Sequence, residues 1–169
     1  MTPPPPPPDP ALALQTSTGK PTIRWAVLLH QPPGQPAHCD LLLQQPSRPG
    51  LLTWRLQRWL ASPPSKPPTN HPPHVHEPPP DAELDAEPAE QLPDHRAVYL
   101  DYQGVLSGGR GSVQRIDSGL LLMLDPTPAT VRAKLRSETG RTIALTLLRE
   151  SPPGTHPARW LCYAALLPG

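Results

Sequence analysis

The sequence predicts a mostly β protein built as a small antiparallel β-barrel, and three observations support this fold class. Apolar residues occur in short runs, clusters of Gly, Pro, Asp or Ser bound most runs, and no run sustains an apolar stripe of helical period over three turns. About eight short strands at this close spacing favour an antiparallel barrel or sandwich. The runs span residues 23–29, 39–43, 51–56, 97–102, 112–116, 120–124, 130–135, 142–148 and 159–166.

Two connections between these runs have distinct patterns. Residues 138–141 (ETGR) separate two runs and are typical of a hairpin turn. Residues 51–60 could form one short helix in place of a strand. Neither pattern changes the predicted class, because the remaining runs are too short and too punctuated for a helical protein.

Prolines divide the chain into a folded part and two extended segments. The 169 residues include 30 prolines, far above the usual share of about 5%. Many of them lie in residues 2–10 and 61–80, and such runs favour extended, unpaired backbone. We therefore expect residues 1–20 to form a disordered proline-rich tail. Residues 21–169 should form a single barrel domain, with residues 61–85 as a long proline-rich, acidic loop inserted in it.

Charge and cysteine content exclude several classes of protein. The net charge is +1, although residues 66–101 carry two basic and eight acidic side chains and residues 102–149 carry seven and three. The two cysteines, Cys39 and Cys162, cannot build the disulfide framework of a small secreted domain. No apolar run approaches the about 20 residues of a membrane span, and the N-terminus has no signal pattern. We expect a cytoplasmic protein without a membrane partner.

The first candidate site combines His30 with His38 and Asp40. Side chains alternate along a strand, so His38, Asp40 and Leu42 share one face. His30 ends the preceding apolar run, and the seven residues between the two histidines could return the chain beside it. An imidazole and a carboxylate on one face can meet the same ion or substrate. The simpler alternative is an exposed His and Asp beside a proline-rich loop.

The second candidate lies in residues 92–102 (LPDHRAVYLDY). If a strand begins near His95, then His95, Tyr99 and Asp101 share one face and present an imidazole, a phenol and a carboxylate. Such a face suits a site better than a core. It could also be an ordinary solvent-exposed face opposite an apolar one.

Two loops could also bind ligands. In residues 107–112 (SGGRGS), glycines let backbone amides approach an anion and Arg110 could bind a phosphate, although a plain turn between strands explains the same pattern. His71, His74 and His76 resemble a metal cluster, but they lie in the proline-rich loop with no ordered scaffold to position them.

In this order, the segments resemble the 3′-phosphoesterase domain of bacterial ATP-dependent DNA ligase D. That family has a strand ending in His, a His-x-Asp strand, a Trp-containing strand, Asp-His-x-x-x-Tyr, an aromatic-acid-Gly turn and a glycine-rich stretch. The corresponding residues here are His30, His38-Cys39-Asp40, Thr53-Trp54, Asp94-His95 with Tyr99, Tyr102-Gln103-Gly104 and residues 107–113. The likeness covers roughly residues 23–119.

The resemblance implies a compact β-barrel with a manganese-dependent activity in DNA repair. Such domains remove a 3′-terminal ribonucleotide and then a 3′-phosphate from nucleic acid. By position, His30, Asp40 and His95 would bind Mn²⁺, with Zn²⁺ as a second possibility. His38 would contact the scissile phosphate, and Tyr99 would help to position it. Implied partners are nucleic-acid 3′ ends and separate ligase or polymerase proteins.

Two positions depart from the family pattern. Leu42 stands where the family's His-x-Asp-x-Arg has its arginine, and Glu87 aligns with a second family arginine if no gap intervenes. Arg55, Arg96 or Arg110 could substitute as phosphate ligands. The sequence favours a phosphoesterase, and it leaves two alternatives open. One is a non-catalytic descendant that binds a metal or a nucleic-acid end in a repair complex. The other is a proline-rich interaction protein whose barrel is only a scaffold.

Overall fold

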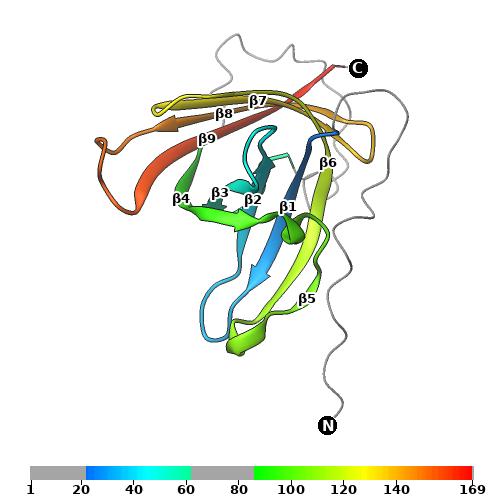
Figure 1. The fold of residues 1–169 in the computed structure, drawn as a ribbon, viewed down its shortest axis with the longest axis vertical. Helices are drawn as coiled ribbons and strands as arrows, with labels where there is room; N and C mark the ends of the chain where they lie inside the picture. Colours follow the sequence, from blue (N-terminus) through cyan, green and yellow to red (C-terminus); the bar gives the residue numbers. More distant parts are fainter. Residues whose placement is uncertain (1–21, 62–85, 169) are drawn as a thin grey trace, which may run out of the picture.

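The structure, a computed structural model, describes residues 22–61 and 86–168. Nine strands and two short 3₁₀ turns make up the regular structure of these residues (Figure 1). The strands are β1 (Arg24–Gln31), β2 (His38–Gln44), β3 (Gly50–Leu56), β4 (Ala86–Arg96), β5 (Gly104–Val105), β6 (Ser112–Pro126), β7 (Thr130–Ser137), β8 (Thr142–Arg149) and β9 (Ala158–Leu167). The 3₁₀ turns are η2 (Ala97–Leu100) and η3 (Ser107–Gly109).

All nine strands belong to one antiparallel sheet that closes on itself. Their order is β1-β2-β3-β4-β9-β8-β7-β6-β5, and an additional pairing of β1 with β6 closes the ring. The first part of β6 pairs with β1 and the second part pairs with β7. This long strand therefore connects two parts of the sheet, and the ring is not a regular barrel. The predicted mostly β, antiparallel class is confirmed.

The main hydrophobic core fills the inside of the ring. On β2, alternation places Cys39, Leu41 and Leu43 in this core, and the other strands contribute their own alternate residues. The tryptophans pack in pairs, Trp25 with Trp59 and Trp54 with Trp160. They supply the large aromatic side chains of a chain that has no phenylalanine.

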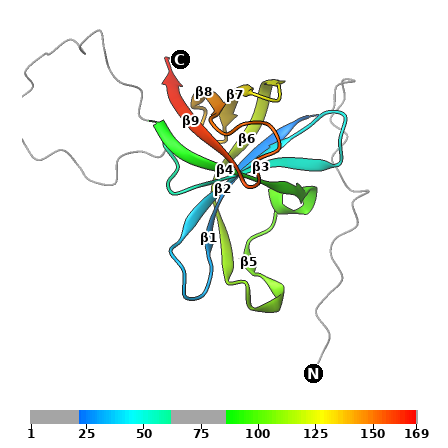
Figure 2. The same cartoon turned by 90° about the vertical axis from the view of Figure 1, so that its left-hand side faces the viewer.

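A second, smaller core lies on the outer face of β1, β2 and β3. Its buried members are Ala26, Leu28, Leu42, Leu51, Leu100, Leu106 and Val113. Leu100 belongs to η2, and Leu106 lies between β5 and η3, so the chain after β4 folds back over this face. Figures 1 and 2 show the β1–β2 hairpin and the β5–η3 segment projecting from the same end of the ring. These three strands are therefore buried on both faces.

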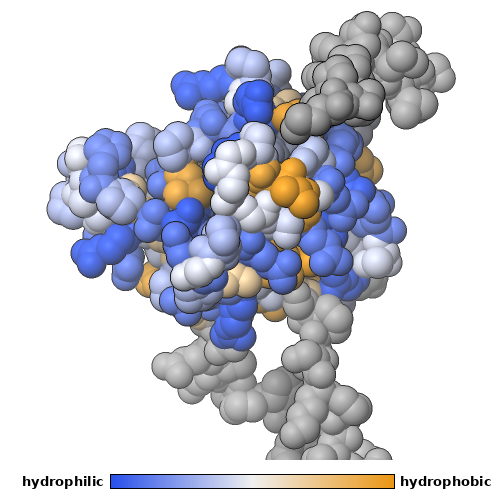
Figure 3. Space-filling model, turned by 90° about the horizontal axis from the view of Figure 1, so that it is seen from below, coloured by the Kyte–Doolittle hydropathy of each residue, from blue (hydrophilic) through white to orange (hydrophobic). Residues whose placement is uncertain are grey.

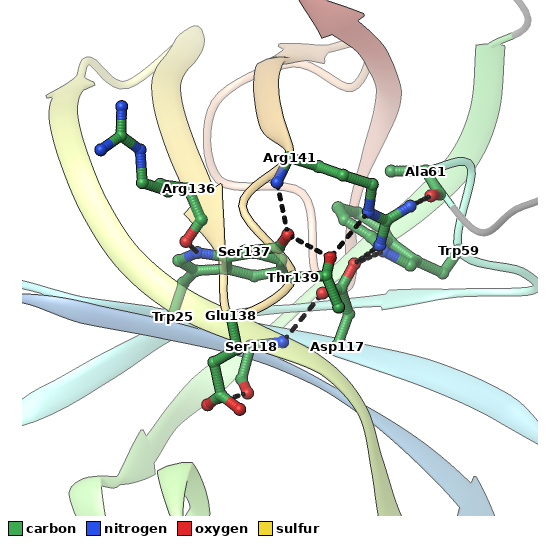
Figure 4. A network of polar contacts seen from close by, with 10 residues as sticks. All are labelled: Trp25, Trp59, Ala61, Asp117, Ser118, Arg136, Ser137, Glu138, Thr139 and Arg141. Carbon is green, nitrogen blue, oxygen red and sulfur yellow. Dashed lines mark hydrogen bonds and ion pairs between the residues drawn. The ribbon is translucent and has the colours of Figure 1, made fainter. Parts of the chain in front are cut away.

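A polar network fixes the seam where β6 passes the end of β3 (Figure 4). The carboxylate of Asp117 accepts hydrogen bonds from Trp59 Nε1 at 2.8 Å and from Arg141 Nη2 at 3.0 Å. Arg141 also donates to the carbonyl of Ala61. Because these residues come from β6, the β7–β8 turn and the segment after β3, the network joins parts of the chain that are not neighbours in the sheet.

Two local predictions differ from the structure, and one strand extends over residues where none was expected. Residues 97–102 do not form a strand, because the carbonyl of Val98 accepts the amide hydrogens of Asp101 and Tyr102 in a tight turn that buries Leu100. Residues 51–60 do not form a helix, since β3 occupies Gly50–Leu56. The strand expected to begin near His95 instead ends there, because β4 spans Ala86–Arg96 and contains two prolines. The predicted hairpin turn at residues 138–141 is confirmed by the pairing of β7 with β8.

Other predictions concern residues outside the described ranges. These are the tail at residues 1–20, nearly all of the loop at residues 61–85, and His71, His74 and His76. Within the part of the chain that the structure describes, no helix has the length and apolar character needed to cross a membrane.

Candidate metal and phosphate site

A pocket of about 490 Å³ lies on the outer face of the sheet, next to the second core. Strands β1 to β4 form its floor, while η2 and the glycine-rich segment cover it. Its polar lining consists of His30, Asp40, Arg55, Asp94, His95, Arg96, Tyr99 and Arg110. The pocket thus gathers five of the six residues that the sequence singles out, and the sixth, His38, contacts two of them from β2.

His30, His38 and Asp40 form a compact group at the mouth of the β1–β2 hairpin. His30 and His38 are cross-strand partners, and His30 Nδ1 lies 3.1 Å from His38 Nε2. Asp40 Oδ2 is 3.8 Å from His30 Nδ1, and Asp40 Oδ1 is 3.6 Å from His38 Nε2. One nitrogen or oxygen atom from each side chain lies within 4.8 Å of the others, so the three can bind one cation.

Backbone carbonyls determine which ring nitrogens are free to bind a metal. His30 Nε2 must donate its hydrogen to the carbonyl of Arg110, 2.8 Å away, which leaves a lone pair on His30 Nδ1. The carbonyl of Pro36 accepts a hydrogen bond from the His38 ring. We assign that bond to Nδ1, because Nε2 faces His30. Two lone pairs and a carboxylate then point at one another, an arrangement that a cation stabilises.

Asp40 is the least satisfied group of the three. Its side chain is only 7% exposed, and its Oδ1 has no hydrogen-bond partner. Burial raises the pKa of this carboxyl group, and the nearby charges of His38, His95, His30 and Arg55 partly oppose that rise. Burial likewise lowers the pKa of His38. A buried carboxylate with one oxygen that receives no hydrogen bond, beside two imidazoles, fits a divalent cation better than it fits the interior of a protein.

His95 and Tyr99 approach the same pocket from the opposite side. His95 lies near the end of β4, opposite Leu51 on β3. Its ring centroid is 5.6 Å from that of Tyr99 on η2. His95 Nδ1 donates to the carbonyl of Pro93 at 3.0 Å, so Nε2 carries the free lone pair. The resemblance assigns His95 to the metal and His38 to the phosphate. The structure instead groups His38 with His30 and Asp40, and leaves His95 outside that set.

Asp101 does not belong to the pocket, although the sequence placed it on a face with His95 and Tyr99. The turn at η2 redirects it, and both its carboxylate oxygens accept hydrogen bonds of 2.8 Å from Arg24. This pair lowers the pKa of Asp101. The strand assumed for residues 97–102 is the source of the error.

Arginines reach the pocket from positions other than those of the family pattern. Arg55 is the β3 partner of Asp40, and Arg96 lies over the Tyr99 ring at 5.8 Å. Arg110 is held by the Ser107 carbonyl, to which its Nε donates at 2.9 Å. The register between β2 and β3 is fixed once the turn between them is known. That register could have predicted that Arg55 lies beside Asp40.

At the two positions where the family has arginines, this chain has residues that stabilise the fold. Leu42 is fully buried in the second core. Glu87 is buried too, and its Oε1 accepts the amide hydrogens of Gln57 and Arg58 at 3.1 and 3.2 Å. It lines neither the pocket nor the outer face around Asp40. Neither position could hold a phosphate-binding arginine without rearrangement, so any such role falls to Arg55, Arg96 and Arg110.

The glycine-rich segment holds the Arg110 carbonyl against His30. Gly111 has φ of +86°, and a Cβ there would lie 1.9 Å from the Gln31 carbonyl oxygen. Only glycine allows the segment to approach β1 this closely. The loop therefore serves the site through its backbone as well as through the Arg110 side chain.

A Gly111→Ala protein should be markedly less stable than a Gly109→Ala protein. Both glycines have positive φ, but a Cβ at Gly109 would meet nothing within 4 Å. Gly109→Ala should cost about 1–2 kcal/mol of unfolding free energy for the left-handed backbone alone. Gly111→Ala should cost more, by at least about 1 kcal/mol, because the segment must move away from β1. Urea unfolding measures both, and equal losses would contradict the close packing at Gly111.

Comparison of the sequence with protein-family models gives no match, and no curated protein matches it either.

Proposed function

We propose that this chain is a metal-dependent phosphoesterase that acts on 3′ ends of nucleic acid, removing a 3′-ribonucleotide or a 3′-phosphate in DNA repair. The proposal depends chiefly on one observation, the buried Asp40 carboxylate whose Oδ1 lacks a partner although two imidazoles surround it. Two imidazoles and a carboxylate suit Mn²⁺ or Zn²⁺. Arginines in the same pocket suit a phosphate.

Each side chain has a distinct task in this proposal. His30, His38 and Asp40 would hold the cation, which when bound would supply positive charge to a phosphoryl oxygen. Arg55 and Arg110 bind the non-bridging oxygens of the phosphate, and Tyr99 orients it. His95, with its free Nε2, either completes the metal set or contacts the phosphate as an acid or base.

The Arg110 backbone also takes part in this scheme. Its carbonyl fixes the His30 tautomer, and the residue also lines the pocket. A change in the loop backbone would therefore disturb metal binding and phosphate binding together. An Arg110→Gln substitution keeps that carbonyl but removes the side-chain hydrogen bonds to Ser107, so it should weaken phosphate binding more than metal binding.

A non-catalytic binding protein is the second candidate, and the arginine positions favour it. Leu42 and Glu87 are committed to packing and to backbone hydrogen bonds, so the family's own phosphate ligands are missing. Arg55 is 44% exposed and approaches Glu90 at 4.0 Å, so its guanidinium is only loosely held. A chain of this kind would bind a metal or a nucleic-acid end without hydrolysis.

We further propose that the partners are nucleic-acid 3′ ends, with ligation and polymerisation supplied by separate repair proteins, and that the protein is cytoplasmic. The pocket's mixture of arginines and aromatic rings supports a nucleotide rather than an apolar ligand. The surface seen in Figure 3 is mostly hydrophilic, with apolar side chains in small separate areas.

A His95→Ala protein should separate the two possible roles of this residue. Calorimetry with Mn²⁺ and hydrolysis of a 3′-phosphorylated primer–template give the two readouts. If His95 contacts the phosphate, Mn²⁺ affinity should stay within about twofold of wild type while the rate falls about 100-fold or more. If it is a metal ligand, affinity and rate should fall together.

His156→Ala provides the matched control, because His156 is exposed on the β8–β9 connection. It should change neither Mn²⁺ affinity nor rate. A wild-type protein that binds Mn²⁺ but hydrolyses neither a 3′-phosphate nor a 3′-ribonucleotide would contradict the enzyme and favour the binding protein. Unchanged Mn²⁺ affinity in His30→Ala and His38→Ala would contradict the metal site.

A further inference from the structure

The outer face of β7 carries a row of three basic side chains. Arg132, Lys134 and Arg136 occupy alternate positions and are exposed, whereas the residues between them are buried in the core. Among the residues that the structure describes, none of these three side chains has a hydrogen-bond or ion-pair partner. Figure 4 shows the Arg136 guanidinium pointing away from the polar network beside it. We call this row the β7 stripe.

The neighbouring strands do little to neutralise the stripe. Opposite Arg136 lie Leu120 on β6 and Thr142 on β8, and opposite Lys134 lie Met123 and Ala144. Asp125 is the β6 partner of Arg132, yet the two groups form no ion pair. By contrast, Arg24, Arg115 and Arg141 each pair with a carboxylate elsewhere on the molecule. The stripe is thus a patch of adjacent positive charges that repel one another until an anion binds.

The stripe is connected to the candidate site along one side of the molecule. Arg136 lines a second pocket, of about 290 Å³, whose other charged lining residues are Arg24, Arg115, Asp101 and Glu138, and Leu100 lines it as well. Leu100 ends η2, whose Tyr99 lines the first pocket, so the two pockets lie on either side of this turn. Arg24 and His30 lie on one face of β1 six residues apart, about 20 Å along the strand. The β7 stripe begins two strands further on, about 10 Å across the sheet.

We propose that the β7 stripe binds the phosphate backbone of a nucleic-acid strand. The repeat of the cations supports a linear polyanion, because alternate side chains recur about every 7 Å along a strand. Phosphates recur along nucleic acid at a comparable interval, and each basic side chain releases counterions when it binds one. The direction of the strand rests on the proposed function: its 3′ end lies in the first pocket, and the preceding nucleotides cross the second pocket to β7.

Two double variants with the same net charge test the proposal. Arg132→Gln/Arg136→Gln removes two charges from the stripe, and Arg48→Gln/Arg159→Gln removes two exposed charges elsewhere. The probe is a fluorescently labelled single-stranded oligonucleotide long enough to span both pockets, titrated by anisotropy over a range of salt concentrations. At about 0.1 M salt the stripe variant should bind roughly 25-fold more weakly, and its slope of log K against log salt should be shallower by about 1.4. The control should match wild type.

Equal weakening in the two variants would overturn the proposal, because net charge alone would then explain binding. Wild-type protein that binds anionic phosphatidylserine vesicles but not the oligonucleotide would overturn it as well. Mn²⁺ calorimetry and hydrolysis of a 3′-phosphorylated dinucleotide distinguish this proposal from the phosphoesterase. If the stripe variant binds the oligonucleotide more weakly and the wild type hydrolyses nothing, the proposal for the β7 stripe is supported and the phosphoesterase proposal is contradicted. If the protein hydrolyses the dinucleotide and the stripe variant binds the oligonucleotide as well as wild type does, the phosphoesterase proposal is supported and the proposal for the β7 stripe is contradicted.

Discussion

An Asp40→Asn protein is expected to lose Mn²⁺ binding and, in the absence of metal, to resist urea better than wild type. Burial raises the pKa of Asp40, so the folded chain holds the ionised carboxylate only at a cost. Because the pKa is raised in the folded state, ionisation of Asp40 lowers the free energy of unfolding. The stability linked to this group is fully present below the usual carboxyl pKa of about 3.9 and is lost as the pH rises through the raised value. At pH 7 the uncharged amide should therefore gain about 1 kcal/mol of unfolding free energy.

Urea unfolding with a chelator, at pH 7 and again near pH 4, checks this expectation. The gain should be present at pH 7 and should shrink at the lower pH, because protonation of Asp40 removes the buried charge. Mn²⁺ calorimetry at pH 7 tests the expected loss of metal binding, and binding by Asp40→Asn should fall below detection. Stabilisation without loss of metal binding would show that the cation is held elsewhere.

Asp117 is a matched control, since its side chain is also buried, at 6% exposed. It differs from Asp40 because Trp59, Arg141 and the amide of Ser118 all donate hydrogen bonds to it. Asp117→Asn removes the charge that these donors satisfy and should cost about 1–3 kcal/mol of unfolding free energy. The same substitution at two buried carboxylates thus has opposite signs. A loss of stability at both would mean that Asp40 is a structural carboxylate rather than a ligand.

The part of the site on β1 and β2 could be predicted from the sequence. Strand alternation alone places His38, Asp40 and Leu42 on one face, and the proline-rich return between the two strands brings His30 beside His38. Both features depend on residues close in the sequence, so no long-range information was needed. The same is true of the hairpin turn at residues 138–141.

The remainder of the site depends on contacts between distant segments. β4 contains Pro88 and Pro93 and several acidic residues, so its composition argues against a strand, yet β3 and β9 pair with it on both sides. Tyr99 reaches the pocket because η2 packs Leu100 on the second core, a contact that no local pattern in the chain reveals. The β7 stripe is visible as alternating cations, but its lack of partners is not.

Arg55 shows most clearly what the sequence could not supply, and its loss should have the largest effect on catalysis among the arginines. Its position opposite Asp40 depends on the β2–β3 register. An Arg55→Gln protein is expected to lose about 10-fold to 100-fold in kcat/KM on a 3′-phosphorylated primer–template, with Mn²⁺ affinity nearly unchanged. The reason is the removal of a charge-assisted contact to the phosphate, worth about 1.5–3 kcal/mol or more in a partly buried site.

Arg55→Lys and Arg159→Gln make this expectation specific. Lysine keeps the charge but not the planar fork, so it should restore only part of the activity. Arg159 is exposed on β9, and its loss should leave kcat/KM within about twofold of wild type. Leu42→Arg should not compensate for Arg55→Gln, because Leu42 is fully buried and an unpaired guanidinium there should destabilise the fold by about 3–5 kcal/mol. If Arg55→Gln retains full activity, or if Leu42→Arg is folded and more active than wild type, the phosphate is bound from β2 rather than β3 and the arrangement proposed for this pocket is wrong.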